Sequence, residues 1–111
     1  MPYFFNPETR TGKLLLPGVV VRTFWGEQML VSQVDLAPGA IVPAHAHPHE
    51  QFGMLLRGEL RISIADETQQ LKVGAIYIVP GGVEHRVVAG EEGAQLIEAF
   101  SPVREEYKFP D

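Results

Sequence analysis

Three histidines and a glutamine are the residues of this sequence best suited to bind a metal ion. His45 and His47 are separated by one residue, Gln51 follows four residues later, and His85 lies beyond a Pro-Gly-Gly turn. Imidazoles suit Zn, Cu, Fe and Ni, and an amide oxygen can complete a site for a divalent ion. If residues 45–47 are extended, alternation places both imidazoles on one face of a strand, where they can share a metal.

Neighbouring residues offer alternatives to this ligand set. Glu50 is adjacent to Gln51 and, being charged, would be a stronger ligand. Strand alternation places Gln51 on the same face as Gly53, which leaves space beside a metal, whereas Glu50 points away. His49 is more typical of a rim residue or of an outer partner that orients a ligand. Ordinary hydrogen bonding in a core or at a surface is the alternative for the three histidines themselves.

Composition limits the kind of protein that this chain can be. Its 111 residues suit one domain over 1–111. The absence of cysteine excludes disulfides and thiolate chemistry and suits a cytoplasmic protein. We expect no signal peptide, and no apolar run approaches the ~20 residues of a membrane helix. A net charge of −5 without a basic cluster argues against a nucleic-acid partner.

The elements that must hold these residues are strands, because short β-rich runs alternate with glycine and proline. In residues 60–64 leucine or isoleucine alternates with a polar residue, which indicates one dry and one wet face. Asp66 and Glu67 are the expected hairpin turn. The expected strands are 18–24, 29–36, 52–56, 60–64, 70–73, 76–79, 85–88 and 94–100. Many short strands at close spacing indicate an all-β sandwich or barrel.

The last expected strand carries a carboxylate on an apolar face. Glu98 shares that face with Leu96 and Phe100, and a buried carboxylate is costly unless it is paired or used. Glu98 either faces solvent or pairs with an arginine, or it transfers a proton in the site, with its pKa raised by burial. Arg104 follows within reach and is either a solvated tail charge or a fork for a substrate carboxylate.

The punctuation around the predicted ligands resembles the two motifs of the cupin superfamily. The first motif, 39–58, fits Gly39, His45, His47, Gln51 and Gly58, and the second, 74–89, fits Gly74, Pro80, Gly82 and His85. The motif has six residues between this position and the glycine, and the six residues before Gly58 are 52–57, which selects Gln51 over Glu50. The chain departs from the pattern at Gln51, where many members have glutamate, and at Ala89, where the second motif often ends in asparagine. The resemblance implies a double-stranded β-helix, the cupin jelly-roll barrel.

A narrower resemblance concerns the small cupins of pectin and alginate breakdown, which help to open 4,5-unsaturated monouronates into linear keto forms. In them three histidines and a glutamine hold the metal, and an acid, an aromatic residue and an arginine line the site. The corresponding positions are Glu98, Phe100 and Arg104, so the resemblance implies a proton-transfer role for Glu98 and substrate contacts for Phe100 and Arg104. The acid in that group is usually aspartate, so Glu98 is a departure.

Two classes of function follow. The first is a Lewis-acid enzyme acting on a small sugar acid through one divalent transition metal, which could be Ni, Zn, Mn, Fe, Co or Cu. The neutral Gln51 leaves the full divalent charge on such an ion, although a three-histidine oxygenase is an alternative. The second class is a cupin that binds a metal or small ligand without catalysis.

Aromatic residues near the N-terminus bear on assembly. Tyr3, Phe4, Phe5, Phe24 and Trp25 are expected in the core or in a dimer interface. Apolar residues of this kind would otherwise be exposed, which favours a homodimer.

Overall fold

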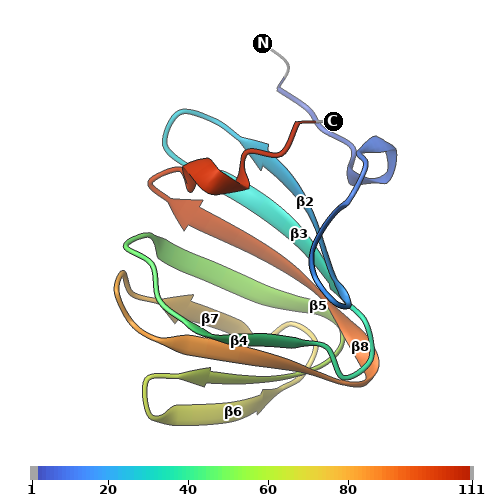
Figure 1. Cartoon of the computed structure of the whole chain (residues 1–111), viewed down its shortest axis with the longest axis vertical. Helices are drawn as coiled ribbons and strands as arrows, with labels where there is room; N and C mark the ends of the chain where they lie inside the picture. The colour runs from blue at the N-terminus through green and yellow to red at the C-terminus, as the bar shows by residue number, and fades with distance from the viewer. Residues whose placement is uncertain (1–2, 111) are drawn as a thin grey trace.

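Antiparallel strands joined by tight turns make up most of the chain (Figure 1). The structure is a computed structural model that describes residues 3–110, so residues 1, 2 and 111 of the expected domain lie outside the described residues. The strands are β1 (Lys13–Leu16), β2 (Val19–Trp25), β3 (Leu30–Leu36), β4 (Ile41–His45), β5 (Glu50–Ile64), β6 (Glu67–Leu71), β7 (Ile76–Val79) and β8 (His85–Ser101). Two short 3-10 helices are η1 (Pro7–Thr9) and η2 (Glu105–Tyr107). Within residues 3–110 no helix has the length and hydrophobicity to span a membrane.

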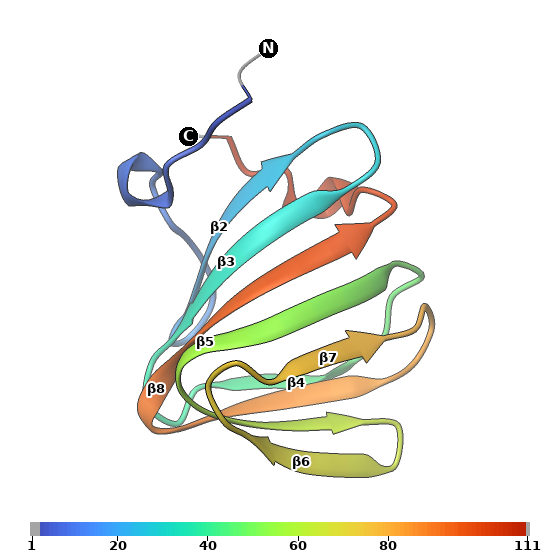
Figure 2. The ribbon, with the colours of Figure 1, turned by 180° about the vertical axis from the view of Figure 1, so that it is seen from behind.

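The long strands β5 and β8 connect the two halves of the sheet (Figures 1 and 2). Residues 50–58 of β5 pair with residues 94–101 of β8, and residues 60–64 pair with residues 85–89. The first pairing is extended by β1, β2 and β3 beside β8 and by β7 beside β5, which together form the large half-sheet. The second is extended by β4 beside β8 and β6 beside β5, which form the small half-sheet. Apolar side chains from both halves pack into one core, as the predicted all-β barrel requires.

The expectation of separate strands at 52–56 and 60–64, and again at 85–88 and 94–100, is wrong. The chain bends at these places without ending the strand, through irregular register near Gly58. Gly58 and Gly93 have φ of 81° and 76°, which glycine adopts without steric cost. A Cβ at Gly58 would also overlap the carbonyl oxygen of Gly93, so the glycines let the two strands approach where both turn.

Further differences from the sequence-based prediction concern the hairpin turn, the strand after it, and the strands β1 and β4, neither of which was among the expected strands. The hairpin turn lies at Ala65 and Asp66, not at Asp66 and Glu67, because Ala65 adopts a φ of 54° and Glu67 already pairs with Ile64. The following strand is therefore β6, not residues 70–73. The edge strand β1 was not predicted, because three of its four residues are exposed and its sequence shows no alternation.

A row of mostly polar residues crosses the inner face of the large half-sheet, with aliphatic side chains on one side of it and a row containing Gln51 and Phe100 on the other. Cross-strand pairing places Thr23, Ser32, Glu98, Gly53 and Tyr77 side by side across β2, β3, β8, β5 and β7. We call these five residues the inner polar row. Their side chains are at most 9% exposed where the residue has one. A row of buried polar groups inside an apolar barrel marks the end of the fold at which a functional site can lie.

Candidate metal centre

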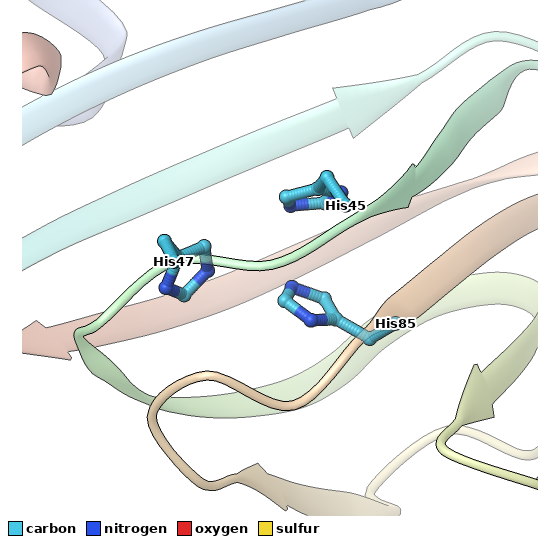
Figure 3. A group of neighbouring side chains, drawn as sticks. All are labelled: His45, His47 and His85. Atoms are coloured by element: carbon cyan, nitrogen blue, oxygen red, sulfur yellow. The ribbon is translucent and has the colours of Figure 1, made fainter.

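The three predicted histidine ligands meet at the polar end of the barrel (Figure 3). His45 ends β4 and pairs in register with His85, which begins β8. One potential ligand atom from each of His45, His47 and His85 lies within 4.8 Å of the others. Residues 45–47 do not form one strand, which was the condition for placing both imidazoles on one strand face, because β4 ends at His45 and His47 lies in the connection to β5. The Gly82 amide donates to the His47 carbonyl over 2.8 Å, which fixes this connection against the Pro-Gly-Gly turn.

Backbone carbonyls set the orientation of all three rings. Nδ1 of His45 lies 2.9 Å from the Pro43 oxygen, and Nδ1 of His85 lies 2.9 Å from the Val83 oxygen. Nδ1 of His47 lies 3.1 Å from the carbonyl oxygen of His49. A carbonyl can only accept, so in a neutral ring the proton belongs on Nδ1 and the lone pair on Nε2. Such outer hydrogen bonds are typical of metal-binding histidines. His49 takes part through its backbone and not through its ring.

The amide of Gln51 presents its oxygen to the same point. Its Nε2 donates to Glu98 Oε2 over 2.6 Å, so Oε1 is the atom that lies 3.0 Å from His47 Nε2. Glu50 is exposed, whereas Gln51 is 4% exposed. Alternation along β5 therefore directs Gln51 inward and Glu50 outward, as the sequence predicted.

This arrangement fits a divalent cation. Oε1 of Gln51 and the unprotonated Nε2 of His47 are both acceptors, and two acceptors in contact need a cation or a proton between them. Burial, with the charge of Arg104, lowers the pKa of His47 to about 4, so the ring is neutral near pH 7. Burial also lowers the pKa of His85, and its buried Nε2 has no hydrogen-bond partner among the described residues. Two ligand atoms each ~2.1 Å from an ion and at right angles would be about 3 Å apart.

Glu98 lies inside the barrel and not on the solvent face. Burial raises the pKa of its carboxyl, although hydrogen bonds from Tyr77 and Gln51 and the charge of Arg104 oppose that rise. The Tyr77 hydroxyl donates to Glu98 Oε2 over 2.7 Å, which is the same oxygen that accepts from Gln51. The buried location and raised pKa agree with the prediction for this residue.

Tyr77 is the residue that sequence reasoning missed. The space expected beside Gly53 is filled by the ring of Tyr77, since a Cβ at position 53 would overlap its hydroxyl end. A sequence pattern that could have revealed Tyr77 lies in residues 76–79, where alternation puts Tyr77 and Val79 on the buried face. A buried tyrosine needs a partner for its hydroxyl, and Glu98 on the next strand but one provides it.

The C-terminal segment brings Arg104 over the site. Its guanidinium carbon lies 3.8 Å from the ring centroid of Tyr107 and 5.2 Å from that of Phe100. Thr23 Oγ1 donates to the Tyr107 carbonyl over 2.6 Å and accepts from the Phe109 amide over 3.3 Å. Thr23 therefore ties this segment to β2 of the same chain. The Arg104 side chain is 11% exposed, and its ion pair with Glu106 measures 3.4 Å at an exposed carboxylate.

One cavity is lined by every predicted site residue except His47. Its polar end is lined by His45, Gln51, His85, Glu98, Phe100, Arg104 and Tyr107. Aliphatic side chains line the remainder, so the polar groups converge at one end of an otherwise apolar space. The fully buried Phe100 packs its ring edge-on against His47, with centroids 5.6 Å apart. The structure thus brings the predicted site residues together, while their roles stay predictions.

The barrel and its histidine cluster define a class of protein. A family model described as the cupin domain matches residues 32–100, and the chain belongs to that family. Pectin degradation protein KdgF of Dickeya dadantii is 34% identical to this chain over 75% of the chain and 76% of its own length.

More distant relatives share part or all of the fold. Oxalate decarboxylase OxdC of Bacillus subtilis is 29% identical over 67% of this chain, and the matched region is 20% of the length of that protein. The structure of KdgF from Halomonas sp. superposes with a TM-score of 0.89 at 24% identity, covering 96% of this chain and 98% of that one. The latter likeness shows the double-stranded β-helix fold.

Proposed function

We propose that this cupin is a metal-dependent enzyme that opens the ring of a small 4,5-unsaturated uronate. The observation that carries the proposal is the convergence of three imidazoles and the Gln51 amide oxygen, beside a cavity that is lined by two of the imidazoles, Gln51, Glu98 and Arg104. The similarity to a pectin degradation protein over three quarters of the chain supports the substrate class.

His45, His47, Gln51 and His85 would hold the ion. Imidazole and amide ligands carry no charge when they bind a metal, so this set leaves the full divalent charge on the ion. When bound, such an ion supplies Lewis-acid polarisation of a substrate hydroxyl or carbonyl without changing its oxidation state. Ni, Zn, Mn, Fe, Co and Cu are all compatible with imidazole and amide ligands.

Glu98 would move the proton. Ring opening takes the proton from the hydroxyl on C1, breaks the bond between C1 and the ring oxygen, and leaves an aldehyde at C1. The enol released at C5 becomes a ketone when a proton is added at C4, so the reaction is an isomerisation that needs no other reactant. The raised pKa of the Glu98 carboxyl suits a group that first accepts and then returns this proton.

Arg104 and Phe100 would hold the substrate. A guanidinium binds a carboxylate through two parallel hydrogen bonds, which fixes orientation as well as position. Stacking on Tyr107 restricts the Arg104 side chain before substrate binds, and exposed Glu106 is a weak competitor for it. Phe100 would give the sugar an apolar surface beside the ligand histidine that it contacts.

The direct test is an assay with a 4,5-unsaturated monouronate. We expect metal-loaded protein to speed the loss of the ultraviolet absorbance of the conjugated double bond, with the linear keto acid appearing by NMR. The saturated uronate is the matched control substrate, and it should bind without a change in ultraviolet absorbance and without forming a keto acid. Oxygen uptake in the same assay would favour the oxygenase, and metal binding without any turnover would favour the non-catalytic cupin.

We further propose that the protein is a homodimer formed through the outer face of the large half-sheet. Cross-strand pairs place Phe24, Val31, Ala99, Phe52 and Ile78 in one row across five strands. This outer apolar row ends at Ile78, which is 52% exposed. A continuous apolar face is typical of an interface between protein chains.

The cytoplasmic location expected from the sequence stays a prediction.

A charge in the middle of the outer apolar row should separate the dimer. We expect Phe52→Glu to halve the mass measured by light scattering, because a second copy would bury the new carboxylate without a partner. Gln69→Glu on exposed β6 is the matched control and should leave the mass unchanged. A monomeric unsubstituted protein at micromolar concentration would contradict the proposal.

A further inference from the structure

A chain of buried hydrogen bonds runs from Tyr77 to the candidate metal centre. The Tyr77 hydroxyl donates to Glu98 Oε2, and Gln51 Nε2 donates to the same oxygen. On its other side, Gln51 Oε1 lies 3.0 Å from His47 Nε2. All four side chains are less than 10% exposed, so water has little access to these groups. The four residues come from β7, β8, β5 and the connection that precedes β5.

The polarity of this chain is fixed by the chemistry of its members. An amide presents one end that accepts and one end that donates, and the two ends have nearly the same shape. A carboxylate has no proton to offer, so Glu98 binds only the NH2 end of Gln51. The oxygen end is then the one directed at His47. A reversed amide would lose its bond to Glu98 and would point two N–H groups at the position of a cation.

Tyr77 in turn holds Glu98. The phenol donates to the oxygen that also accepts from the Gln51 amide, so two donors, one from β7 and one from β5, restrain one carboxylate oxygen. The ring reaches this place because Gly53 has no side chain, whereas a Cβ there would overlap the ring. The pair Gly53 and Tyr77 is in register on β5 and β7, and Gly53 is in register with Glu98 on β8.

We propose that Tyr77 and Glu98 position the Gln51 amide so that its oxygen faces the metal, which makes Tyr77 a positioning residue for a ligand that it does not touch. Glu98 then has two tasks, orientation of Gln51 and proton transfer, and the first does not depend on turnover. The inference rests on the proposed metal centre but not on the proposed substrate. Outer partners of metal ligands commonly change metal affinity by about 10- to 100-fold when they are removed.

The test is the metal dissociation constant of variants, measured by competition of Zn²⁺ or Ni²⁺ with a chromogenic chelator. Tyr77→Phe removes one oxygen atom and keeps the ring, and we expect it to weaken binding by about tenfold. Glu98→Leu removes the acceptor itself and should weaken binding at least as much. Tyr3→Phe is the matched control, because it removes the same hydroxyl from an exposed ring outside the cavity, and it should leave the constant unchanged.

A double-variant cycle separates orientation from simple packing. In a Gln51→Ala background there is no amide to orient, so adding Tyr77→Phe should change the dissociation constant less than twofold. An equal weakening in both backgrounds, or no weakening in either, would overturn the proposal. The NMR signals of the Gln51 side-chain NH2 provide a second reading, because loss of the bond to Glu98 in Glu98→Leu should shift them. Unchanged signals would contradict the orientation role even if that variant is less stable.

The outcomes also separate this inference from the proposed function. Protein that binds metal with the expected cycle but opens no unsaturated uronate would overturn the substrate proposal alone. If the protein opens the ring but Tyr77→Phe leaves its metal dissociation constant unchanged, the positioning role alone would be overturned. Failure of the unsubstituted protein to bind either ion would overturn both.

Discussion

Replacing His85 with alanine is expected to remove the metal from the purified protein. His85 brings a buried Nε2 that has no hydrogen-bond partner among residues 3–110, and its Nδ1 is already committed to the Val83 carbonyl. The ring is thus oriented for a ligand and has no other structural bond to make. Metal content measured by mass spectrometry should fall from about one ion per chain to near zero, and further addition of His47→Ala should change little.

His49→Ala is the matched control for this experiment. His49 lies in the same connection, and its ring is 5.5 Å from that of His47, yet it is outside the group of converging histidines. Its link to the site is a backbone carbonyl, which alanine keeps. We expect this variant to retain its metal. Equal losses from both variants would mean that the content depends on general stability, and retention by His85→Ala would refute the predicted ligand set.

The sequence predicted the location of the site better than the course of the strands. Glycine and proline were read as breaks, yet Gly58 and Gly93 allow β5 and β8 to bend and continue. A glycine with positive φ can end a strand or bend it, and only its partner across the sheet decides which. In this chain the two bends face each other, and a contact between residues so far apart in sequence cannot be predicted from a local pattern.

The convergence of the candidate ligands was predictable because it depends on local spacing. Alternation along β5 was enough to place Gln51 inside and Glu50 outside. His45 and His47 do not share a strand, yet their rings converge, because the connection after β4 brings His47 back beside the end of that strand. Cross-strand contacts were beyond the sequence, and for that reason Tyr77 was missed although it touches Glu98.

The anchor of the C-terminal segment was also unpredictable. Arg104 reaches the cavity because Thr23, far away in sequence, bonds the backbone of Tyr107 and Phe109. The identity of Thr23 matters through one hydroxyl that both donates and accepts. A threonine in a strand gives no sign of this in sequence, since β-branched residues are common there for their backbone preference alone.

Replacing Glu98 with glutamine is expected to abolish turnover while the metal stays bound. The carbonyl oxygen of the new amide can take the place of Oε2 and accept from both Tyr77 and Gln51, so the orientation of Gln51 survives. The amide cannot accept and return a proton. Removing a general acid–base group typically lowers kcat by about 10²- to 10⁴-fold. Steady-state kinetics on the unsaturated uronate, beside metal content, would measure both effects.

Two further variants decide what the result means. Glu98→Asp keeps the carboxyl and shortens its reach, so we expect partial activity, because a shorter acid cannot stay 2.6 Å from Gln51 and 2.7 Å from Tyr77 without a shift. Glu50→Gln changes an exposed carboxylate in the same site region and should leave kcat and metal content unchanged. Full turnover by Glu98→Gln would remove Glu98 from proton transfer. Loss of turnover together with loss of metal would instead assign it to the orientation of Gln51 alone, since a residue needed only for chemistry leaves the bound ion in place.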